Sequence, residues 1–157
     1  MSKGIDYLVE AVPEIVKENP DGVLVFNLIH AKRDKEMKQK IQEISNRVGG
    51  YIHIFDGFSQ QELRELIATA DLVIAPSLAE GFGSVHSETC AMKKTLVTTQ
   101  VAAIPEVVSG NVKFIQPCSS ESIVQGIREV RKGKSVRIAK KEFDRDESVK
   151  RLEELYG

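Results

Sequence analysis

The chain has 157 residues, of which 41% are hydrophobic and 29% charged, and its formal net charge is −1. This profile fits one globular domain and gives no electrostatic basis for general attraction to nucleic acid or membranes. No apolar run is long enough to span a bilayer, and the first residues do not resemble a signal peptide, so we expect a cytoplasmic protein without a transmembrane segment. Cys90 and Cys118 form no close-spaced motif and are expected to be reduced.

Strand and helix patterns alternate along the chain. Apolar residues at helical spacing predict a first helix over 4–18, with Pro13 as a local irregularity. Ser59 and Glu62 have the spacing of a capping box, which predicts the start of a helix that runs to about Ala70. The other predicted elements are strands at Val23–Phe26, Tyr51–Phe55, Leu72–Ala75, Thr95–Thr98 and Val112–Ile115, helices over 34–47, 88–92, 119–131 and 142–157, and a turn over 104–108.

This alternation predicts an α/β fold, in which one domain over residues 1–157 forms a mostly parallel, Rossmann-like sheet with helices on both faces. Residues 132–141 are rich in Lys and Arg and are expected to form a solvated basic connector before the last helix. In sheets of this kind, ligands bind at the carboxyl ends of the strands. The functional residues are therefore expected in the loops that follow the strands.

The most informative loop is the segment Pro76–Glu88, which follows the apolar strand Leu72–Ala75 and leads into a helix. A glycine-bearing loop at a helix start offers free backbone N–H groups and the positive end of the helix dipole, which suits a phosphate. The two carboxylates Glu80 and Glu88 bracket this junction. A loop that binds phosphate alone does not need them, whereas carboxylates suit hydroxyl groups. The loop thus predicts a sugar or ribose beside a phosphate.

The spacing Glu80-x7-Glu88, with Gly-Phe-Gly after the first Glu, resembles the signature of the retaining family 4, or group 1, glycosyltransferases. Further similarities follow in order along the chain, and together they are more specific than a lone glycine loop. They are Lys3-Gly4-Ile5-Asp6-Tyr7-Leu8, Ile52-His53-Ile54-Phe55-Asp56-Gly57, Glu62-Leu63 through Ala70-Asp71, Ile104-Pro105-Glu106-Val107-Val108, and the terminal helix Phe143 to Tyr156. The resemblance implies the C-terminal, donor-binding half of a GT-B fold, which consists of two Rossmann-like domains facing a cleft.

The resemblance also implies roles for the residues of the signature. Glu80 is expected to bind hydroxyl groups of the donor sugar as the catalytic residue, and Glu88 to bind the ribose hydroxyls. Lys3 is expected to meet the distal phosphate, and the backbone at Ile54 and Phe55 to contact the base. The sugar and the diphosphate are expected to bind the backbone N–H groups of Phe82, Gly83, Ser84 and Val85.

The chemistry implied by the family is metal-independent, with a nucleotide-diphosphate sugar as co-substrate and no other cofactor. Negative charge that builds on the departing diphosphate is stabilised by a helix N-terminus and a lysine. Retention by front-face attack within an ion pair requires mainly positioning and charge stabilisation from the protein. No metal site is expected, and no nucleic-acid partner.

The chain departs from the family pattern at four places. The family has a strand ending in Gly-Arg before the Lys-Gly helix, and in a Rossmann order that strand is central, so Val23–Phe26 and Leu72–Ala75 are expected to lack a shared neighbour. Asn27-Leu28-Ile29-His30 replaces a glycine-rich turn, and Ala102-Ala103 replaces a glycine pair near the donor. His86 stands where an apolar residue is common.

The acceptor-binding N-terminal domain is not in the sequence, so we expect a nucleotide-sugar donor and a separate acceptor-binding domain as partners, and no turnover by this domain alone. Two alternatives remain open at this point. The domain is a non-catalytic nucleotide-sugar-binding subunit or fragment, or it belongs to another GT-B enzyme such as a sugar-nucleotide epimerase. The E-x7-E spacing favours the glycosyltransferase over the epimerase.

Overall fold

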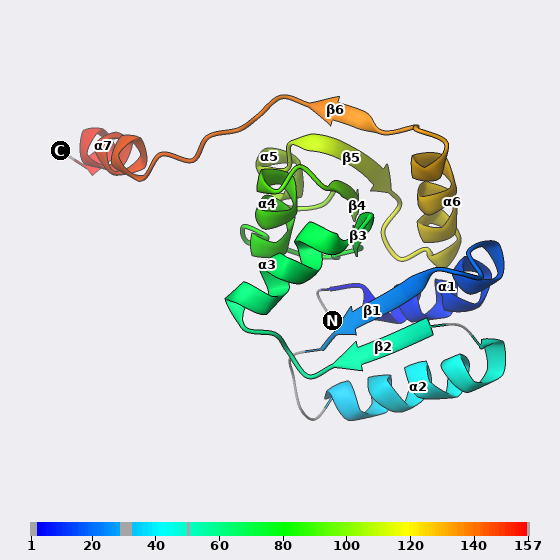
Figure 1. The fold of residues 1–157 in the computed structure, drawn as a ribbon. Coiled ribbons are helices and arrows are strands. Elements are labelled where there is room, and N and C mark those ends of the chain that lie inside the picture. Colours follow the sequence, from blue (N-terminus) through cyan, green and yellow to red (C-terminus); the bar gives the residue numbers. More distant parts are fainter. Residues whose placement is uncertain (1–2, 29–32, 50, 157) are drawn as a thin grey trace.

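The computed structural model describes residues 3–28, 33–49 and 51–156, and its elements alternate as predicted (Figure 1). The helices are α1 (Ile5–Glu18), α2 (Arg33–Val48), α3 (Gln60–Thr69), α4 (Ser84–Ala91), α5 (Ile104–Val107), α6 (Ser120–Arg131) and α7 (Arg145–Tyr156). The strands are β1 (Val23–Asn27), β2 (Tyr51–Phe55), β3 (Leu72–Ala75), β4 (Thr95–Thr99), β5 (Gly110–Ile115) and β6 (Val136–Ile138). The capping box of Ser59 and Glu62 is present at the start of α3, and α1 continues through Pro13.

The strands form two separate sheets, which confirms that β1 and β3 lack a shared neighbour. One sheet pairs β1 with β2 in parallel, and the other has the order β3-β4-β5-β6. Within the described ranges no strand joins β1 to β3, so each has one unpaired edge. Side chains of the edge strand β3 are all half-buried although their sequence, Leu-Val-Ile-Ala, is typical of a fully buried strand.

Helices cover both faces of the four-stranded sheet, as the alternating pattern predicted (Figure 1). On β4, Val97 faces the cluster formed with α1 and α6, whereas its neighbour Leu96 faces the cluster formed with α4 and α5. The α1 cluster also includes Phe26 of β1, so a single apolar core extends under both sheets. This helix therefore holds the two sheets together where no strand does.

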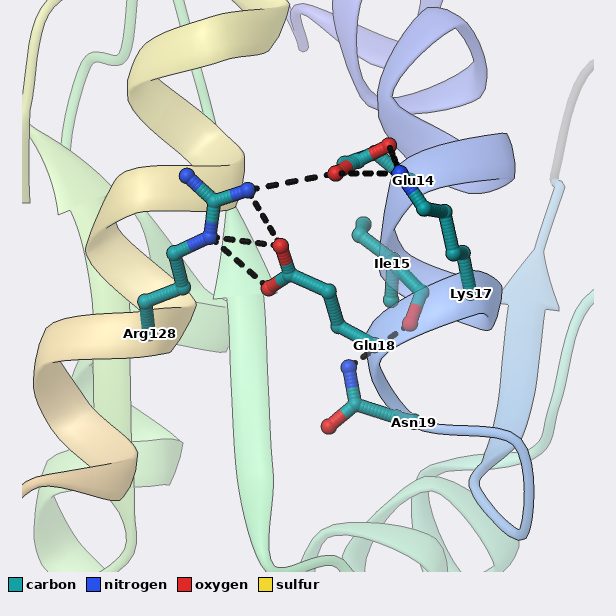
Figure 2. A network of polar contacts seen from close by, with 6 residues as sticks. All are labelled: Glu14, Ile15, Lys17, Glu18, Asn19 and Arg128. Carbon is teal, nitrogen blue, oxygen red and sulfur yellow. Dashed lines mark hydrogen bonds and ion pairs between the residues drawn. The ribbon is translucent and has the colours of Figure 1, made fainter.

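A network of charges fastens α1 to α6 (Figure 2). The guanidinium of Arg128 on α6 donates from Nε to the two carboxylate oxygens of Glu18 at 2.6 and 2.8 Å, and from Nη2 to Glu14 at 3.3 Å. The hydrogen bonds from Arg128 hold the pKa of Glu18 below its ordinary value. At the end of α1, the side chain of Asn19 donates to the Ile15 carbonyl at 2.6 Å. Since β4 and β5 lie beneath α6, this network ties α1 to the four-stranded sheet.

The region after α6 differs in part from the sequence prediction. The basic connector 132–141 is largely exposed, but it also contains the short strand β6, which was not predicted. This strand pairs antiparallel with β5, with Asn111 opposite Arg137, and closes that edge of the sheet. A segment of three residues is too short for a period-two signal, so only the free edge of β5 makes it a strand. The last helix begins at Arg145 and lies apart from the other elements (Figure 1).

Candidate functional site

The predicted site lies at the carboxyl end of β3, where the chain turns into α4. Gly83 is the N-cap residue of α4 and has φ 83°, in the left-handed region that favours glycine. A Cβ atom on Gly83 would lie 2.8 Å from Nδ1 of His86, so the position also excludes a side chain for lack of space. Gly81 has neither constraint, because a Cβ there would meet nothing within 4 Å. Of the two loop glycines, Gly83 is therefore the one that the fold requires.

The start of α4 is an uncapped helix N-terminus. The first N–H groups of a helix have no carbonyl partner within it, and here no side chain caps them. The residues that line this end are those of the predicted phosphate-binding set, and the side chains of two of them, Phe82 and Val85, are 47% and 36% exposed. The N–H groups and the helix dipole thus point to an anion. The predicted backbone-binding residues are Phe82, Gly83, Ser84 and Val85.

The structure brings Glu80 and Lys3 together. Nζ of Lys3 donates to Oε1 of Glu80 at 2.5 Å, although the two residues are 77 positions apart. Ser77 donates to the same oxygen at 2.8 Å. Burial acts to raise the pKa of Glu80, but the hydrogen bonds from Lys3 and Ser77 outweigh it and keep that pKa below its ordinary value. Glu80 is therefore an ionised, oriented carboxylate at neutral pH.

Gly4 explains how Lys3 reaches the site. This residue precedes α1 with φ 65°, and a Cβ atom on it would lie 1.9 Å from the carbonyl oxygen of Pro76. Only glycine lets the backbone pass so close to the residue that follows β3. The close approach sets the first residues of the described chain against the carboxyl end of β3, where Glu80 lies. The Lys-Gly pair is thus a structural unit as well as a sequence motif.

Glu88 is the fifth residue of α4 and is half-buried. Because Glu88 lies one turn beyond the helix start, a favourable interaction with the positive end of the helix dipole does not explain why a carboxylate stands at this position. Eight positions separate it from Glu80, and the turn at Gly83 lies between them. Along the chain, the two carboxylates therefore stand on either side of the helix start, and the ribose-binding role of Glu88 stays a prediction.

Ile54 and Phe55 lie in β2, on the two-stranded sheet, and the structure does not join them to the carboxylate cluster. The carbonyl oxygen of Phe55 accepts the N–H of Leu28 at 3.0 Å, so part of its backbone is already used. The ring of Phe55 is 42% exposed and lies 4.8 Å from the ring of Phe58, measured between centroids. The base-contacting role of these residues stays a prediction.

Sequence reasoning missed a group of buried polar side chains beneath the loop. Ser77, Thr98 and Thr99 are at most 2% exposed. The hydroxyl of Thr99 donates to the Ser77 carbonyl, and that of Thr98 donates to the Ala75 carbonyl at 2.8 Å. These bonds tie the loop to β4 and fix its start. A polar residue in an otherwise apolar strand was the available signal, since Thr98 and Thr99 follow Leu96-Val97.

The C-terminal segment also touches the loop. The ring of Phe143 meets that of Phe82 edge to face, with centroids 5.1 Å apart, and Lys141 donates to the Pro105 carbonyl. Both aromatic rings remain about half exposed. Phe82, the residue between Gly81 and Gly83, therefore packs against the segment that leads to α7. No sequence signal indicated this pair.

The departures from the family pattern at Ala102 and at Leu28 fall in the described ranges and have a structural correlate. Ala102 has φ 48°, in the left-handed region, so an alanine occupies a backbone conformation that favours glycine. At the other turn, Leu28 completes β1 by its bond to Phe55, while Ile29 and His30 lie outside the described residues. The strain at Ala102 is consistent with a glycine position filled by a larger residue.

An α/β domain in which a strand leads through a glycine turn into a helix start, beside the paired Glu80 and Lys3, has the architecture of a Rossmann-like domain. The family model described as "Glycosyl transferases group 1" matches residues 1–132, and the chain belongs to this family. No helix in the described ranges is long and apolar enough to cross a membrane.

Two curated relatives illustrate the relationship. An uncharacterized glycosyltransferase of Methanocaldococcus jannaschii is 26% identical over 132 residues, which cover 82% of this chain and 32% of that protein. The MMP alpha-(1->4)-mannosyltransferase of Mycolicibacterium hassiacum is 31% identical over 107 residues, 68% of this chain and 25% of that protein. The chain therefore spans a third or less of the length of these two relatives.

Solved structures show the same fold. The C-terminal domain of a glycosyl transferase group 1 family protein from Francisella tularensis matches with a TM-score of 0.71 and 23% identity, over 83% of this chain and 70% of that one. The HepE protein of Anabaena, solved with UDP and glucose, matches with a TM-score of 0.69 and 19% identity, over 83% of this chain and 36% of that one. The fold is that of the C-terminal domain of GT-B glycosyltransferases.

Proposed function

We propose that this chain is the donor-binding half of a retaining glycosyltransferase that uses a nucleoside-diphosphate sugar. One observation supports this most directly: an uncapped helix start lies between two carboxylates, and one of these, Glu80, is paired with Lys3. Such a site offers N–H groups and a cation to a diphosphate, and carboxylates to the hydroxyl groups on either side of it. Family membership and the complex of the HepE neighbour with UDP and glucose support the same ligand class.

In this proposal each group at the site has a separate part. The backbone N–H groups from Phe82 to Val85 hold the diphosphate, and Glu88 accepts hydrogen bonds from the ribose. Glu80 accepts hydrogen bonds from the donor sugar, and its low pKa keeps it an acceptor at neutral pH. Lys3, 61% exposed, exchanges part of its contact with Glu80 for the distal phosphate. The backbone at Ile54 and Phe55 contacts the base.

The catalytic effect follows from charge. As the bond between the sugar and the diphosphate breaks, negative charge grows on the diphosphate oxygen. In this proposal the dipole of α4 and the ammonium of Lys3, once it has turned from Glu80 to the distal phosphate, stabilise the leaving group without a metal ion. Glu80 stabilises positive charge at the sugar and holds it for attack from the same face. The protein supplies no covalent intermediate in this scheme.

The acceptor binds elsewhere. In this proposal a facing domain supplies the acceptor site, and the relatives have room for such a domain because the matched segment covers a third or less of their length. The isolated domain is therefore expected to bind donor nucleotide without transferring sugar. Transfer of sugar by residues 1–157 alone to any acceptor would contradict this division of labour.

Calorimetry with UDP and with GDP tests the proposal. Saturable binding is expected, and Glu88→Ala is expected to weaken it about 10- to 100-fold by removing charge-assisted hydrogen bonds to the ribose. Glu121→Ala is the matched control, because Glu121 is an exposed acid in the first turn of α6. Glu80→Gln is expected to leave nucleotide binding intact and to remove the extra affinity of the sugar nucleotide. Absence of binding by both nucleotides overturns the proposal.

A further inference from the structure

The side chain of His86 lies under the candidate site and is 1% exposed. Its Nε2 lies 3.0 Å from Oγ1 of Thr98. The hydroxyl hydrogen of Thr98 is already donated to the Ala75 carbonyl at 2.8 Å. Thr98 is therefore the acceptor in its contact with His86, so Nε2 carries the proton and Nδ1 carries a free lone pair.

The free lone pair is directed at the helix start. Nδ1 of His86 is buried and has no hydrogen-bond partner among the residues that the structure describes. It also lies where a Cβ atom on Gly83 would approach within 2.8 Å, so the N-cap residue of α4 lies directly against it. A buried nitrogen without a hydrogen-bond partner lowers the stability of the folded state, and such atoms are rare in native structures. Its place beneath the N–H groups that would hold a diphosphate connects it to ligand binding.

Opposing influences act on the ring in the free domain. Burial favours the neutral form and holds the pKa of His86 below its ordinary value of 6.5. The carboxylate of Glu80 favours the imidazolium, as does the Ala75 carbonyl, whereas the ammonium of Lys3 opposes it. Lys3 and Glu80 are paired with each other, so their opposite effects on the ring partly cancel. The free domain therefore holds His86 neutral at pH 7.

We propose that His86 is a positioning residue of the donor site that takes up a proton at Nδ1 when a nucleoside diphosphate binds to the N-terminus of α4. This inference rests on the proposed function and adds to it the uptake of a proton by His86. The incoming diphosphate brings negative charge to the turn above the ring. It also draws Lys3 away from Glu80, and both changes favour the imidazolium. A hydronium ion or a buffer acid gives up the proton and keeps the electron pair of the bond that breaks, while the lone pair at Nδ1 forms the new N–H bond.

The consequence is a positive charge beneath the diphosphate. It adds to the α4 dipole and to Lys3 in stabilising the ligand and the leaving group. Because binding raises the affinity of His86 for a proton, donor affinity is expected to fall as pH rises through the bound-state pKa, by at most tenfold per pH unit for one proton. An apolar residue at position 86 lacks this contribution.

Calorimetry with UDP-glucose in two buffers of different ionisation enthalpy at pH 6.5 measures the proton directly. UDP-glucose suits the test because both of its phosphates are esterified and do not titrate near neutrality. We expect uptake of up to one proton by the wild-type domain, and none by His86→Gln, whose amide keeps a donor for Thr98 but cannot ionise. His53→Gln is the control, since His53 is exposed on β2 and its loss is expected to leave the uptake unchanged.

Nitrogen NMR of the free domain gives a second measurement that needs no variant. His86 is expected to show the Nε2–H tautomer and to have a pKa below its ordinary value of 6.5. Binding of UDP-glucose without proton uptake, uptake that persists in His86→Gln, or an Nδ1–H tautomer in the free domain overturns the inference while the proposed function stands. Absence of binding by UDP, GDP and UDP-glucose overturns both.

Discussion

The two sheets of this domain have similar strands but very different surroundings. In β4, four of five residues are fully buried, because the strand has a partner on each side and helices on both faces. In β1, Val23 and Val25 are 59% and 37% exposed, because only β2 pairs with it. The comparison shows that strand neighbours, more than strand composition, decide burial. It also shows why the loop Pro76–Glu88 is well supported, since it follows β3 of the four-stranded sheet.

Hydrogen exchange is expected to show the largest difference between the sheets. Amides of β1 and β2 are expected to exchange roughly 100-fold or more faster than those of β4, because a two-stranded sheet opens locally at low cost while β4 exchanges only on global unfolding. Native-state exchange followed by NMR or mass spectrometry measures this. Equal protection of Val25 and Val97 would contradict the comparison.

An added strand is expected to remove the difference in protection between the two sheets. A strand that leads into Gly4 would end at the edge where β3 ends, because Gly4 touches Pro76. Adding a Val- and Ile-rich segment of about five residues before Met1 is therefore expected to protect β1 and raise the melting temperature. A Gly/Ser segment of equal length is the control. A melting temperature that rises equally with both segments would show that the open edges accept no strand.

Gly4→Ala is expected to have the next largest effect, because Gly4 joins α1 to the end of β3. The alanine Cβ would collide with the Pro76 backbone, and we expect a loss of about 2–4 kcal/mol in the free energy of unfolding. Gly49→Ala is the matched control, since Gly49 has φ 68° but open space around it. Its cost is expected to be about 1 kcal/mol, from backbone strain alone. Urea denaturation compares them, and equal losses would rule out the close contact.

Lys3→Met tests the pair that links α1 to the loop. The pKa of Glu80 lies below its ordinary value of 4.5, so the stabilisation from its ionised form is present above that pH and is lost as pH falls through the folded-state pKa. We expect the variant to lose about 0.5–1 kcal/mol at pH 7, a modest value because Lys3 is largely exposed, and to lose less stability than the wild type between pH 5 and pH 3.

Lys17→Met is the control for this experiment, because Lys17 is an exposed lysine paired with Glu14 within α1. Urea denaturation across this pH range gives the comparison. If Lys3→Met retains the wild-type acid sensitivity, the pairing with Glu80 does not contribute to stability in solution.

Ala102→Gly is expected to have the smallest effect and the opposite sign. Removing the methyl group relieves the backbone strain of the left-handed conformation at φ 48°. We expect this effect to outweigh the greater freedom of glycine in the unfolded chain, so that the free energy of unfolding rises by about 0.5 kcal/mol. Ala70→Gly is the control, because Ala70 has φ −66° and is expected to lose about 0.5–1 kcal/mol. Thermal unfolding shows whether each variant is more or less stable than the wild type. A loss of stability in both variants would show that Ala102 is unstrained.

Much of the fold and of the site was predictable because the signals are local. The run Leu72–Ala75 and the capping box at Ser59 depend on neighbouring residues only, and the structure has both elements. The loop between Glu80 and Glu88 was recognisable from spacing for the same reason. Strand β6 was missed, because its pairing depends on an edge of β5 that lies more than 20 residues earlier. The ring pair of Phe82 and Phe143 was missed for the same reason, since these two residues are even farther apart in the sequence.

The sequence by itself determined the order of elements and the membership of the family, and it predicted the loop Pro76–Glu88 as the ligand site. It also predicted that Val23–Phe26 and Leu72–Ala75 lack a shared neighbour. Only the tertiary structure decided that the sheet divides in two, that Lys3 meets Glu80, and that His86 lies unpartnered beneath Gly83. The physical reason is that periodicity and capping act within a few residues, whereas strand edges and buried polar partners are supplied by segments far away in the chain.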